Sequence, residues 1–373
     1  MGKYDDDFFG GKRPWSVIKD RVLRDYMNVY LAKVNTRGQH IVLIDAYAGP
    51  GVFQDGSNGS PIIICTAAEK FAKNNYSAFF FNIRQDFHSQ LETALKNSGF
   101  NSAHAFKTNS LKTINQLPQI LKDNTVFLYL DPFGLKGCGY DQLEPFLKRN
   151  SKYSTEIVLT MCMPAVHRMA AFHAVKRGEI NEKTKKYHER LTTVFGGDYW
   201  KDILYQENVD AETKEFQLID AYLSKSAQFL PFTGYCPVRQ KSDSRIKYFM
   251  VFVSGHPDAM VLMNDIMHKA YFSQMHRADF QGTLFEELDW RDMPLTDDRS
   301  EQKLNALIKE LVSKYPGETR ENIWLQVVKS NFMKYERKFY RSLLKNMADK
   351  SQIVYQVDPS TGRRNENSKL YPV

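Results

Sequence analysis

The 373-residue sequence predicts an α/β fold with a doubly wound parallel sheet. Residues 41–44 and 126–130 are continuous apolar runs, which are typical of parallel strands covered on both faces. An acidic residue and a turn follow each run, as expected where an open α/β sheet binds its ligands. Helical segments alternate with the strands, beginning with residues 15–34, whose apolar residues recur at helical spacing. Further strands are expected at residues 77–83, 104–107, 156–161 and 247–254.

The first motif is the sequence LIDAYAGPG at residues 43–51. Its glycines permit a tight turn and a close approach of the backbone to a ligand. The pattern differs from the GxGxxG of dinucleotide-binding enzymes and resembles the first motif of nucleic-acid methyltransferases, which holds S-adenosylmethionine. The alternative is an ordinary turn between a strand and a helix. The residues predicted to contact this cofactor are Asp45, Ala48, Gly49 and Gly51.

The next helix is delayed by the polar stretch VFQDGSNGSP at residues 52–61. Ser60 is a good N-cap residue, and Pro61 suits the first helical position because its missing N–H is not needed there. The sequence therefore predicts a helix that begins with Pro61.

The second motif is YLDPFG at residues 129–134. It resembles the D-P-P-Y motif of amino-methyltransferases, in which the acid and the proline-side carbonyl accept hydrogen bonds from an exocyclic NH2 and the aromatic ring stacks on a flipped base. Here the second proline is missing, so DPFG is closer to the motif of the tRNA guanine N2-dimethyltransferases. This resemblance implies catalytic roles for Asp131, Pro132 and Phe133. In the alternative, Asp131 caps a turn and Phe133 lies in the core.

Two asparagines are candidates for the rest of the cofactor site. The end of the second strand usually presents an acid to the ribose hydroxyls, and this chain has Asn82 there, with Asp86 a few residues on. Asn109 follows the third strand, where an amide or acid commonly meets the adenine amine. The asparagine at 82 is the visible departure from the usual pattern.

Composition limits the environment of the protein. No apolar run approaches the roughly 18 residues of a membrane span, and the acidic, aromatic N-terminus is unlike a signal peptide. The four cysteines have no metal-ligand spacing, so neither a metal nor a disulfide is implied. We therefore expect a cytoplasmic protein without a metal site.

The positive charge is concentrated near the C-terminus. Residues 300–373 contain 14 Lys and Arg against 8 Asp and Glu, which is +6 of the net charge of +8. Three predicted helices, at residues 302–312, 320–328 and 335–347, precede two strands at 353–357 and 369–373 that flank a Gly-Arg-Arg tip. This outline is that of a winged helix. The predicted nucleic-acid contacts are Lys334, Arg337, Lys338, Arg341, Arg363 and Arg364. An ordinary basic surface or a protein-binding module are the alternatives.

These motifs together resemble the bacterial three-Cys-motif partner protein family, known as TcmP. The resemblance includes FFGGKRPWSVIKDRVLRDYM, IDAYAGPGVFQDGSNGSP, YLDPFGLKG and YFMVFVSGHPDAMVLMNDIM, and it spans nearly the whole chain. It implies a Rossmann-like methyltransferase domain over residues 1–295, with a helical lobe at about 165–230, and a winged-helix-like domain over 300–373. It also implies a partner, a radical-SAM-like protein with three closely spaced cysteines.

Two functional hypotheses follow from the sequence. The first is an S-adenosylmethionine-dependent methyltransferase that acts on an exocyclic amine of a nucleic acid base. The second is a non-catalytic, methyltransferase-like adaptor that binds the three-Cys protein and delivers it to nucleic acid. Intact Gly49, Gly51 and Asp131 favour the enzyme, whereas Asn82 and the missing second proline favour the adaptor.

Overall fold

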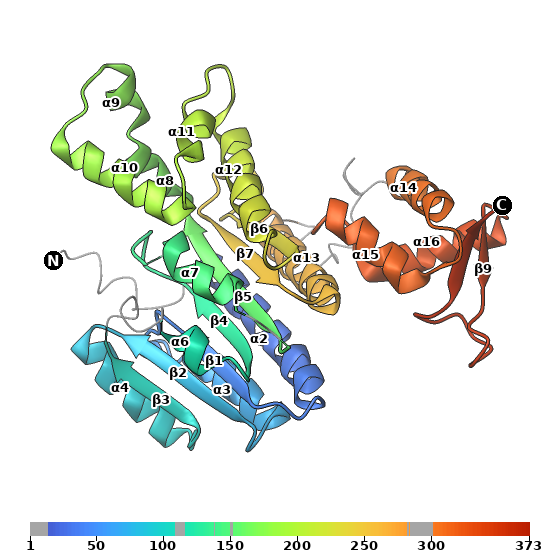
Figure 1. The fold of residues 1–373 in the computed structure, drawn as a ribbon, viewed down its shortest axis with the longest axis horizontal. Coiled ribbons are helices and arrows are strands. Elements are labelled where there is room, and N and C mark those ends of the chain that lie inside the picture. The colour runs from blue at the N-terminus through green and yellow to red at the C-terminus, as the bar shows by residue number, and fades with distance from the viewer. Residues whose placement is uncertain (1–13, 109–115, 138, 150–151, 282, 284–300) are drawn as a thin grey trace. The chain divides into compact units, whose positions relative to one another are not determined.

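The computed structural model describes residues 14–108, 116–137, 139–149, 152–281, 283 and 301–373 (Figure 1). The chain divides into two compact units, Met1–His256 and Pro257–Val373. The long helix α13 (Pro257–Phe280) therefore belongs to the second unit, whereas the sequence analysis assigned it to the first. Among the described residues, no helix has the length and apolar character needed to cross a lipid bilayer.

The first unit is built on a seven-stranded sheet of order β3-β2-β1-β4-β5-β7-β6. Strands β1 to β5 are parallel, and β7 is antiparallel to its neighbours β5 and β6. This mainly parallel sheet confirms the predicted Rossmann-like methyltransferase fold class. The strands are β1 (Ile41–Asp45), β2 (Tyr76–Asn82), β3 (Ala103–Lys107), β4 (Thr125–Leu130), β5 (Thr155–Cys162), β6 (Phe232–Val238) and β7 (Tyr248–Ser254).

Strand β6 is the one strand of this sheet that the sequence analysis did not predict. It lies at the sheet edge and pairs only with β7. Gly234 and Pro237 lie inside β6. Both residue types are rare in the interior of a strand, and the sequence does not show that this strand lies at the edge of the sheet. An edge strand tolerates them, because one side of its backbone needs no partner.

Helices cover both faces of the sheet. On one face, Phe127 of β4 packs against Tyr26 and Tyr30 of α2, with ring centroids 6.1 and 5.6 Å apart. On the other face, Val42 and Ile44 join a core cluster with α7 and the helical lobe between β5 and β6. The helices of this unit among the described residues are α2 (Pro14–Asn35), α3 (Ser60–Phe71), α4 (Gln85–Asn97), α6 (Leu117–Ile120), α7 (Tyr140–Leu147), α8 (Met163–Ala170), α9 (Phe172–Lys176), α10 (Glu182–Phe195), α11 (Tyr199–Leu204) and α12 (Ala211–Ser226).

The start of α3 differs from the prediction by one residue. Gly59 is the N-cap, and Ser60 is the first helical residue. The Ser60 hydroxyl does not cap the helix, because it donates a hydrogen bond to Asp45 Oδ2 at 2.6 Å. A polar contact with the end of β1 thus replaces the expected capping bond.

In its described residues, the second unit contains α13, three shorter helices and a three-stranded antiparallel sheet of order β8-β10-β9. Trp324 and Tyr340 stack in its core, with ring centroids 4.8 Å apart. The predicted helices and hairpin are present, and the interpretation of this unit as a winged helix stays a prediction. Its elements after α13 are α14 (Glu301–Lys314), β8 (Glu318–Thr319), α15 (Arg320–Ser330), α16 (Arg337–Asp349), β9 (Ile353–Gln356) and β10 (Lys369–Pro372).

Glu156 is a carboxyl group buried in the core of the first unit. The Tyr26 hydroxyl donates a hydrogen bond to its Oε2, and the Ser154 hydroxyl donates one to its Oε1 at 3.2 Å. Burial raises the pKa of Glu156 from 4.5 to about 7, and these two hydrogen bonds oppose the rise only in part. The folded protein therefore holds a proton that the unfolded chain releases at lower pH.

The first prediction concerns this proton. Between pH 4.5 and about 7 the folded state binds this proton more tightly than the unfolded state does. The contribution of Glu156 to the free energy of unfolding is therefore fully present at low pH and is lost as the pH rises through this window. Glu156→Gln should reduce the fall in unfolding free energy over this range. Urea unfolding at a series of pH values measures it. An unchanged pH dependence would show that Glu156 is already ionised in the folded protein.

Candidate functional site

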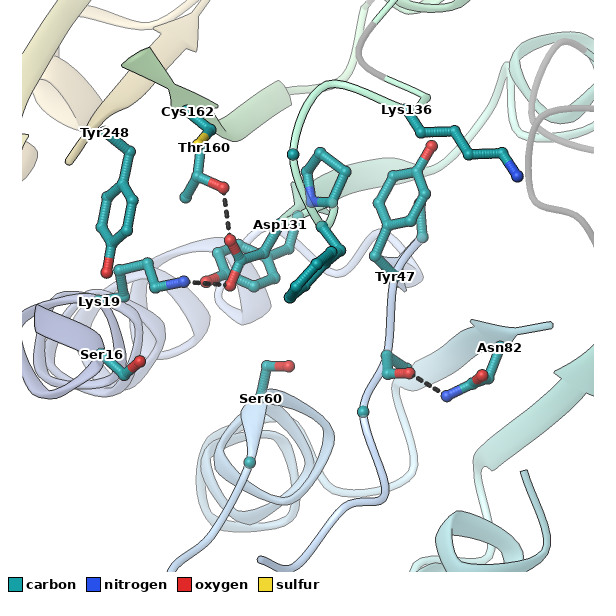
Figure 2. A pocket seen from close by; sticks show the side chains of 18 of the residues that line it. Ser16, Lys19, Tyr47, Ser60, Asn82, Asp131, Lys136, Thr160, Cys162 and Tyr248 are labelled. Atoms are coloured by element: carbon teal, nitrogen blue, oxygen red, sulfur yellow. Dashed lines mark hydrogen bonds and ion pairs between the residues drawn. The ribbon is translucent and has the colours of Figure 1, made fainter. Parts of the chain in front are cut away.

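A cavity of about 560 Å³ opens at the carboxyl ends of β1 and β4 (Figure 2). The order of strands along the sheet reverses between these two strands, which is where open α/β sheets bind their ligands. The volume lies in the range of cofactor and small-molecule sites. The turn after β1, the end of β2, the turn after β4, the end of β5 and the first turns of α2 all contribute to its wall.

The turn after β1 is fixed by hydrogen bonds to both neighbouring strands. The Ala46 N–H donates to the Tyr129 carbonyl at 3.1 Å, and the Ala48 N–H donates to the Phe81 carbonyl at 3.0 Å. The Tyr47 hydroxyl donates to the Gly137 carbonyl at 2.7 Å, which joins this turn to the loop after β4. A backbone held at so many points is preorganised for a ligand.

Asp45 lies behind this turn and does not line the cavity. Its two carboxyl oxygens accept hydrogen bonds from the Tyr47 N–H at 3.0 Å and from the Ser60 hydroxyl at 2.6 Å. Burial raises the pKa of Asp45 to about 7, against the opposing effect of these two bonds. The structure thus places Asp45 as a residue that shapes the predicted cofactor loop, while Ala48 and Gly49 line the cavity itself.

Gly49 lines the cavity, whereas Gly51 packs against α4. Its φ of +87° lies in the left-handed region, and a Cβ added there would lie 3.1 Å from both Ala94 Cβ and Leu91 Cδ1. Gly51 therefore allows the loop to turn against α4. Gly51 does not line the cavity, and its predicted contact with the cofactor stays a prediction.

Asn82 braces the same loop. Its amide NH2 donates to the Ala48 carbonyl, and its amide oxygen accepts from the Arg84 N–H at 2.9 Å. Asp86 pairs with the Arg84 guanidinium at 2.5 Å and does not line the cavity. Asn82 does line it, although both ends of its amide already have partners. Asn109, the predicted adenine contact, lies outside the described residues.

Asp131, Pro132 and Phe133 line the cavity opposite the β1 turn. The Asp131 side chain is 28% exposed, and two side chains from other elements hold its carboxylate. Phe133 is 71% exposed, which excludes the alternative that it belongs to the core. An exposed phenylalanine beside a carboxylate can offer its ring to a planar ligand.

Three residues around Asp131 were missed by sequence reasoning. Lys19 of α2 pairs with Asp131, Thr160 of β5 donates a hydrogen bond to Asp131, and the Tyr248 ring of β7 lies 4.7 Å from the Lys19 ammonium (Figure 2). Lys19 directly follows Ile18 in the apolar stripe of α2. A lysine beside such a stripe was the available signal, and it is a weak one, since most such lysines reach solvent.

Three cationic residues line the cavity on other elements. Lys136 follows the DPFG turn, Arg168 lies on α8 and Lys247 precedes β7, and all three line the cavity. Lys136 and Arg168 are exposed, and neither forms an ion pair within the part of the chain that the structure describes. We call Lys136, Arg168 and Lys247 the cationic rim. It is suited to a ligand that carries negative charge next to a planar group.

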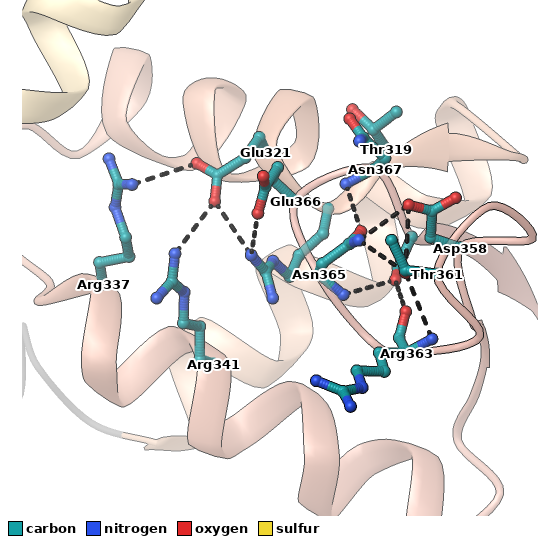
Figure 3. Close-up of polar contacts among 12 residues, drawn as sticks. Thr319, Glu321, Arg337, Arg341, Asp358, Thr361, Arg363, Asn365, Glu366 and Asn367 are labelled. Atoms are coloured by element: carbon teal, nitrogen blue, oxygen red, sulfur yellow. Dashed lines mark hydrogen bonds and ion pairs between the residues drawn. The ribbon is translucent and has the colours of Figure 1, made fainter. Parts of the chain in front are cut away.

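The predicted nucleic-acid contacts of the second unit divide into two groups. Arg337 pairs with Asp265 at 2.9 Å and with Glu321 at 3.4 Å, and Arg341 also pairs with Glu321 at 3.4 Å (Figure 3). These acids offset part of the charge that the sequence assigned to phosphate binding. The remaining predicted contacts are all exposed: Lys334, Lys338, Arg363 and Arg364.

The hairpin tip that carries Arg363 is organised by Asp358. This carboxylate accepts hydrogen bonds from the Ser360 N–H at 2.9 Å and from the Asn365 amide at 2.8 Å, and the Thr361 hydroxyl lies 3.3 Å away (Figure 3). Together these hydrogen bonds lower the pKa of Asp358 to about 2, and the bond from the Asn365 amide has the largest effect. The tip therefore has a defined shape, which is a requirement for any specific contact.

No family model matches this chain, and no curated protein matches it. Similar solved structures include a protein from Legionella pneumophila, with 8% identity over 65% of this chain and 88% of that one and a TM-score of 0.40. An rRNA methylase from Streptococcus thermophilus has 10% identity over 61% and 92% of the two chains, with a TM-score of 0.27. A dimethyladenosine transferase from Plasmodium falciparum has 10% identity over 87% and 95%, with a TM-score of 0.30. Because these TM-scores are low, the fold class rests on the strand order, and membership of the three-Cys-motif partner family stays a prediction.

The second prediction compares two glycines of the β1–α3 loop. Gly56 has a φ of +78° and no atom within 4 Å of an added Cβ, so Gly56→Ala should cost only the left-handed backbone, about 1–2 kcal/mol. Gly51→Ala adds crowding against Leu91 and Ala94, which costs about 1–3 kcal/mol more. Unfolding free energies of both variants measure the difference. Equal losses would show that the loop does not pack closely on α4.

Proposed function

We propose that this protein is an S-adenosylmethionine-dependent methyltransferase whose acceptor is an exocyclic amine of a nucleic acid base. One observation carries the proposal. The glycine turn after β1 and the Asp131-Pro132-Phe133 turn after β4 line the same cavity. The two motifs were assigned separately to a cofactor and to an acceptor, and a methyl group can pass between two ligands only when both lie in one site.

The cavity wall fits the cofactor on the side of the β1 turn. Ala48 and Gly49 offer backbone that a ligand can approach closely, and we assign them to its methionine end. Phe81 and the exposed Ile83 provide apolar surface beside Asn82, where we place the nucleoside. When bound, S-adenosylmethionine supplies a methyl group on a positively charged sulfur, which leaves as a neutral thioether.

The residues of the β4 turn fit an amine on the opposite side. Asp131 accepts a hydrogen bond from the NH2 group, the Pro132 carbonyl accepts the second, and Phe133 stacks on the base. The hydrogen bonds draw electron density onto the nitrogen as it attacks. With the cofactor bound, this nitrogen would form a bond to the methyl carbon while the sulfur keeps the electron pair of the carbon–sulfur bond that breaks, and the nitrogen would then lose one proton to solvent.

The cationic rim supports a polynucleotide acceptor rather than a free base. A base that is turned out of its strand keeps a phosphodiester on each side, and Lys136 and Arg168 line the cavity that would receive the base. Phosphate contacts position a nucleic acid without reading its sequence. The exposed cations of the second unit form a separate candidate surface for the same partner.

The adaptor is the second candidate function, and it is favoured by one specific observation. Asn82 uses both ends of its amide within the protein, and no acid replaces it at the end of β2. In this proposal the methyltransferase-like unit binds the radical-SAM-like three-Cys protein and has no turnover of its own.

The third prediction tests the enzyme against the adaptor. Asp131→Ala should reduce methyl transfer roughly a hundredfold or more, as does the loss of other preorganised polar groups, because the carboxylate contributes mainly as the nitrogen attacks. The affinity for S-adenosylmethionine should change little. Transfer of tritiated methyl to total RNA and DNA and calorimetry with the cofactor measure the two quantities.

A matched control for this variant is Asp123→Ala, which removes an exposed carboxylate from the turn that precedes the same strand. Equal incorporation by the wild type and Asp131→Ala would remove Asp131 from catalysis. If the wild type gives no incorporation and no heat with millimolar cofactor, the adaptor is the favoured function.

The fourth prediction compares the two cationic surfaces. Lys136→Glu with Arg168→Glu should weaken nucleic-acid binding and reduce the slope of log affinity against log salt by roughly 0.7–0.9 for each phosphate that is no longer neutralised. Arg363→Glu with Arg364→Glu is the corresponding pair in the second unit. Fluorescence anisotropy with labelled RNA and DNA at several salt concentrations measures the affinity and its salt dependence for both double variants. A change in the second pair alone would assign binding to residues 300–373, and no change in either would argue against nucleic acid.

A further inference from the structure

Asp131 is held by two side chains from two other elements. The Lys19 ammonium, on α2, lies 2.6 Å from Asp131 Oδ2, and the Thr160 hydroxyl, on β5, donates a hydrogen bond to Asp131 Oδ1 (Figure 2). Each carboxylate oxygen therefore has one donor. We call Lys19, Asp131 and Thr160 the carboxylate clamp.

Lys19 is placed in an unusual environment for a lysine. Its side chain is only 10% exposed, and its ammonium lies 4.7 Å from the centroid of the Tyr248 ring. Removing an ammonium from water is costly unless a charged partner compensates it. The partner of Lys19 in the described structure is Asp131, and this contact compensates for the burial of the ammonium.

The ion pair is not needed to dock α2 on the sheet. Ile18, Val22 and Tyr26 are each at most 1% exposed, and they continue as an apolar stripe to the end of the helix. Such a stripe is sufficient to fix an amphipathic helix. The stripe would dock α2 equally well if the Lys19 side chain extended into solvent. We therefore look for the role of the buried Lys19 in its contact with Asp131.

We propose that Lys19 is a positioning residue that fixes the Asp131 carboxylate for the acceptor amine; this inference rests on the proposed function. A carboxylate oxygen can accept two hydrogen bonds, and the clamp uses one on each oxygen. The Asp131 side chain is 28% exposed and lines the cavity, so a ligand amine can reach the carboxylate there. The Lys19 ammonium and the Thr160 hydroxyl hold the carboxylate in one orientation, and a carboxylate in that orientation can accept hydrogen bonds from an NH2 group. Lys19 thus acts through Asp131 and does not contact the acceptor.

A double-mutant cycle tests whether Lys19 acts through Asp131. The variants are Lys19→Met, Asp131→Asn and the double variant, and Lys33→Met in the last turn of the same helix is the control. Lys19→Met should lower kcat for methyl transfer roughly tenfold to a hundredfold, the range expected when a reacting group loses its alignment. The KM for S-adenosylmethionine should stay within about twofold. In the Asp131→Asn background, Lys19→Met should have no further effect on kcat.

The outcomes separate this inference from the proposed function. Losses of kcat that multiply in the double variant, or a Lys19→Met enzyme as fast as the Lys33→Met control, would overturn the role of Lys19 and leave the methyltransferase in place. No transfer by the wild type to RNA or DNA would overturn both. If Lys19→Met does not fold, Lys19→Gln keeps most of the chain length without the charge, and the same non-additivity with Asp131→Asn is expected of it.

Discussion

The pairing of β1 with β4 is the constraint on which the rest of the site depends. Asp45 is opposite Tyr129 in this parallel ladder, so the two strands end at the same edge of the sheet. The Ala46 N–H then bonds to the Tyr129 carbonyl, two residues before Asp131. Because the hydrogen-bonded ladder fixes both strand ends, the turn after β1 and the turn after β4 have a set separation. A direct transfer between two ligands needs such a fixed geometry.

Two carboxyl groups near this edge are stabilised in different ways. Asp45 is fully buried behind the turn, where burial raises its pKa to about 7 and the Ser60 hydroxyl and the Tyr47 N–H hold it in place. Asp131 faces the cavity and has a cation beside it. The negative charge of Asp131 raises the pKa of Asp45, and the charge of Lys19 lowers it. One buried lysine therefore moderates the repulsion between the two carboxyl groups while it fixes the one that faces the ligand.

The sequence was sufficient for the parts of the fold that depend on local pattern. The apolar runs located β1 and β4 within one residue at each end, since buried parallel strands have a strong signal. The edge strand β6 was missed because it contains Gly234 and Pro237, which are uncommon inside strands. Lys19 and Thr160 could not be predicted as partners of Asp131, because 112 and 29 residues separate them from it in the chain. The ion pairs of Arg337 and Arg341 were missed for the same reason: Glu321 lies on a different helix.

The asparagine at position 82 has a structural explanation that changes how it bears on function. Its amide donates to the Ala48 carbonyl and accepts from the Arg84 N–H. A carboxylate can only accept, so an aspartate here would place a negative charge against the Ala48 carbonyl and loosen the turn that Gly49 belongs to. The turn after β1 therefore requires a hydrogen-bond donor at position 82, which the Asn82 amide provides. An acid missing from the end of β2 is then a consequence of how the loop is braced, and it is not in itself a sign that the cofactor site has been lost. The adaptor hypothesis therefore needs support from the binding measurement itself, because the one departure from the usual cofactor pattern is accounted for by the geometry of the turn.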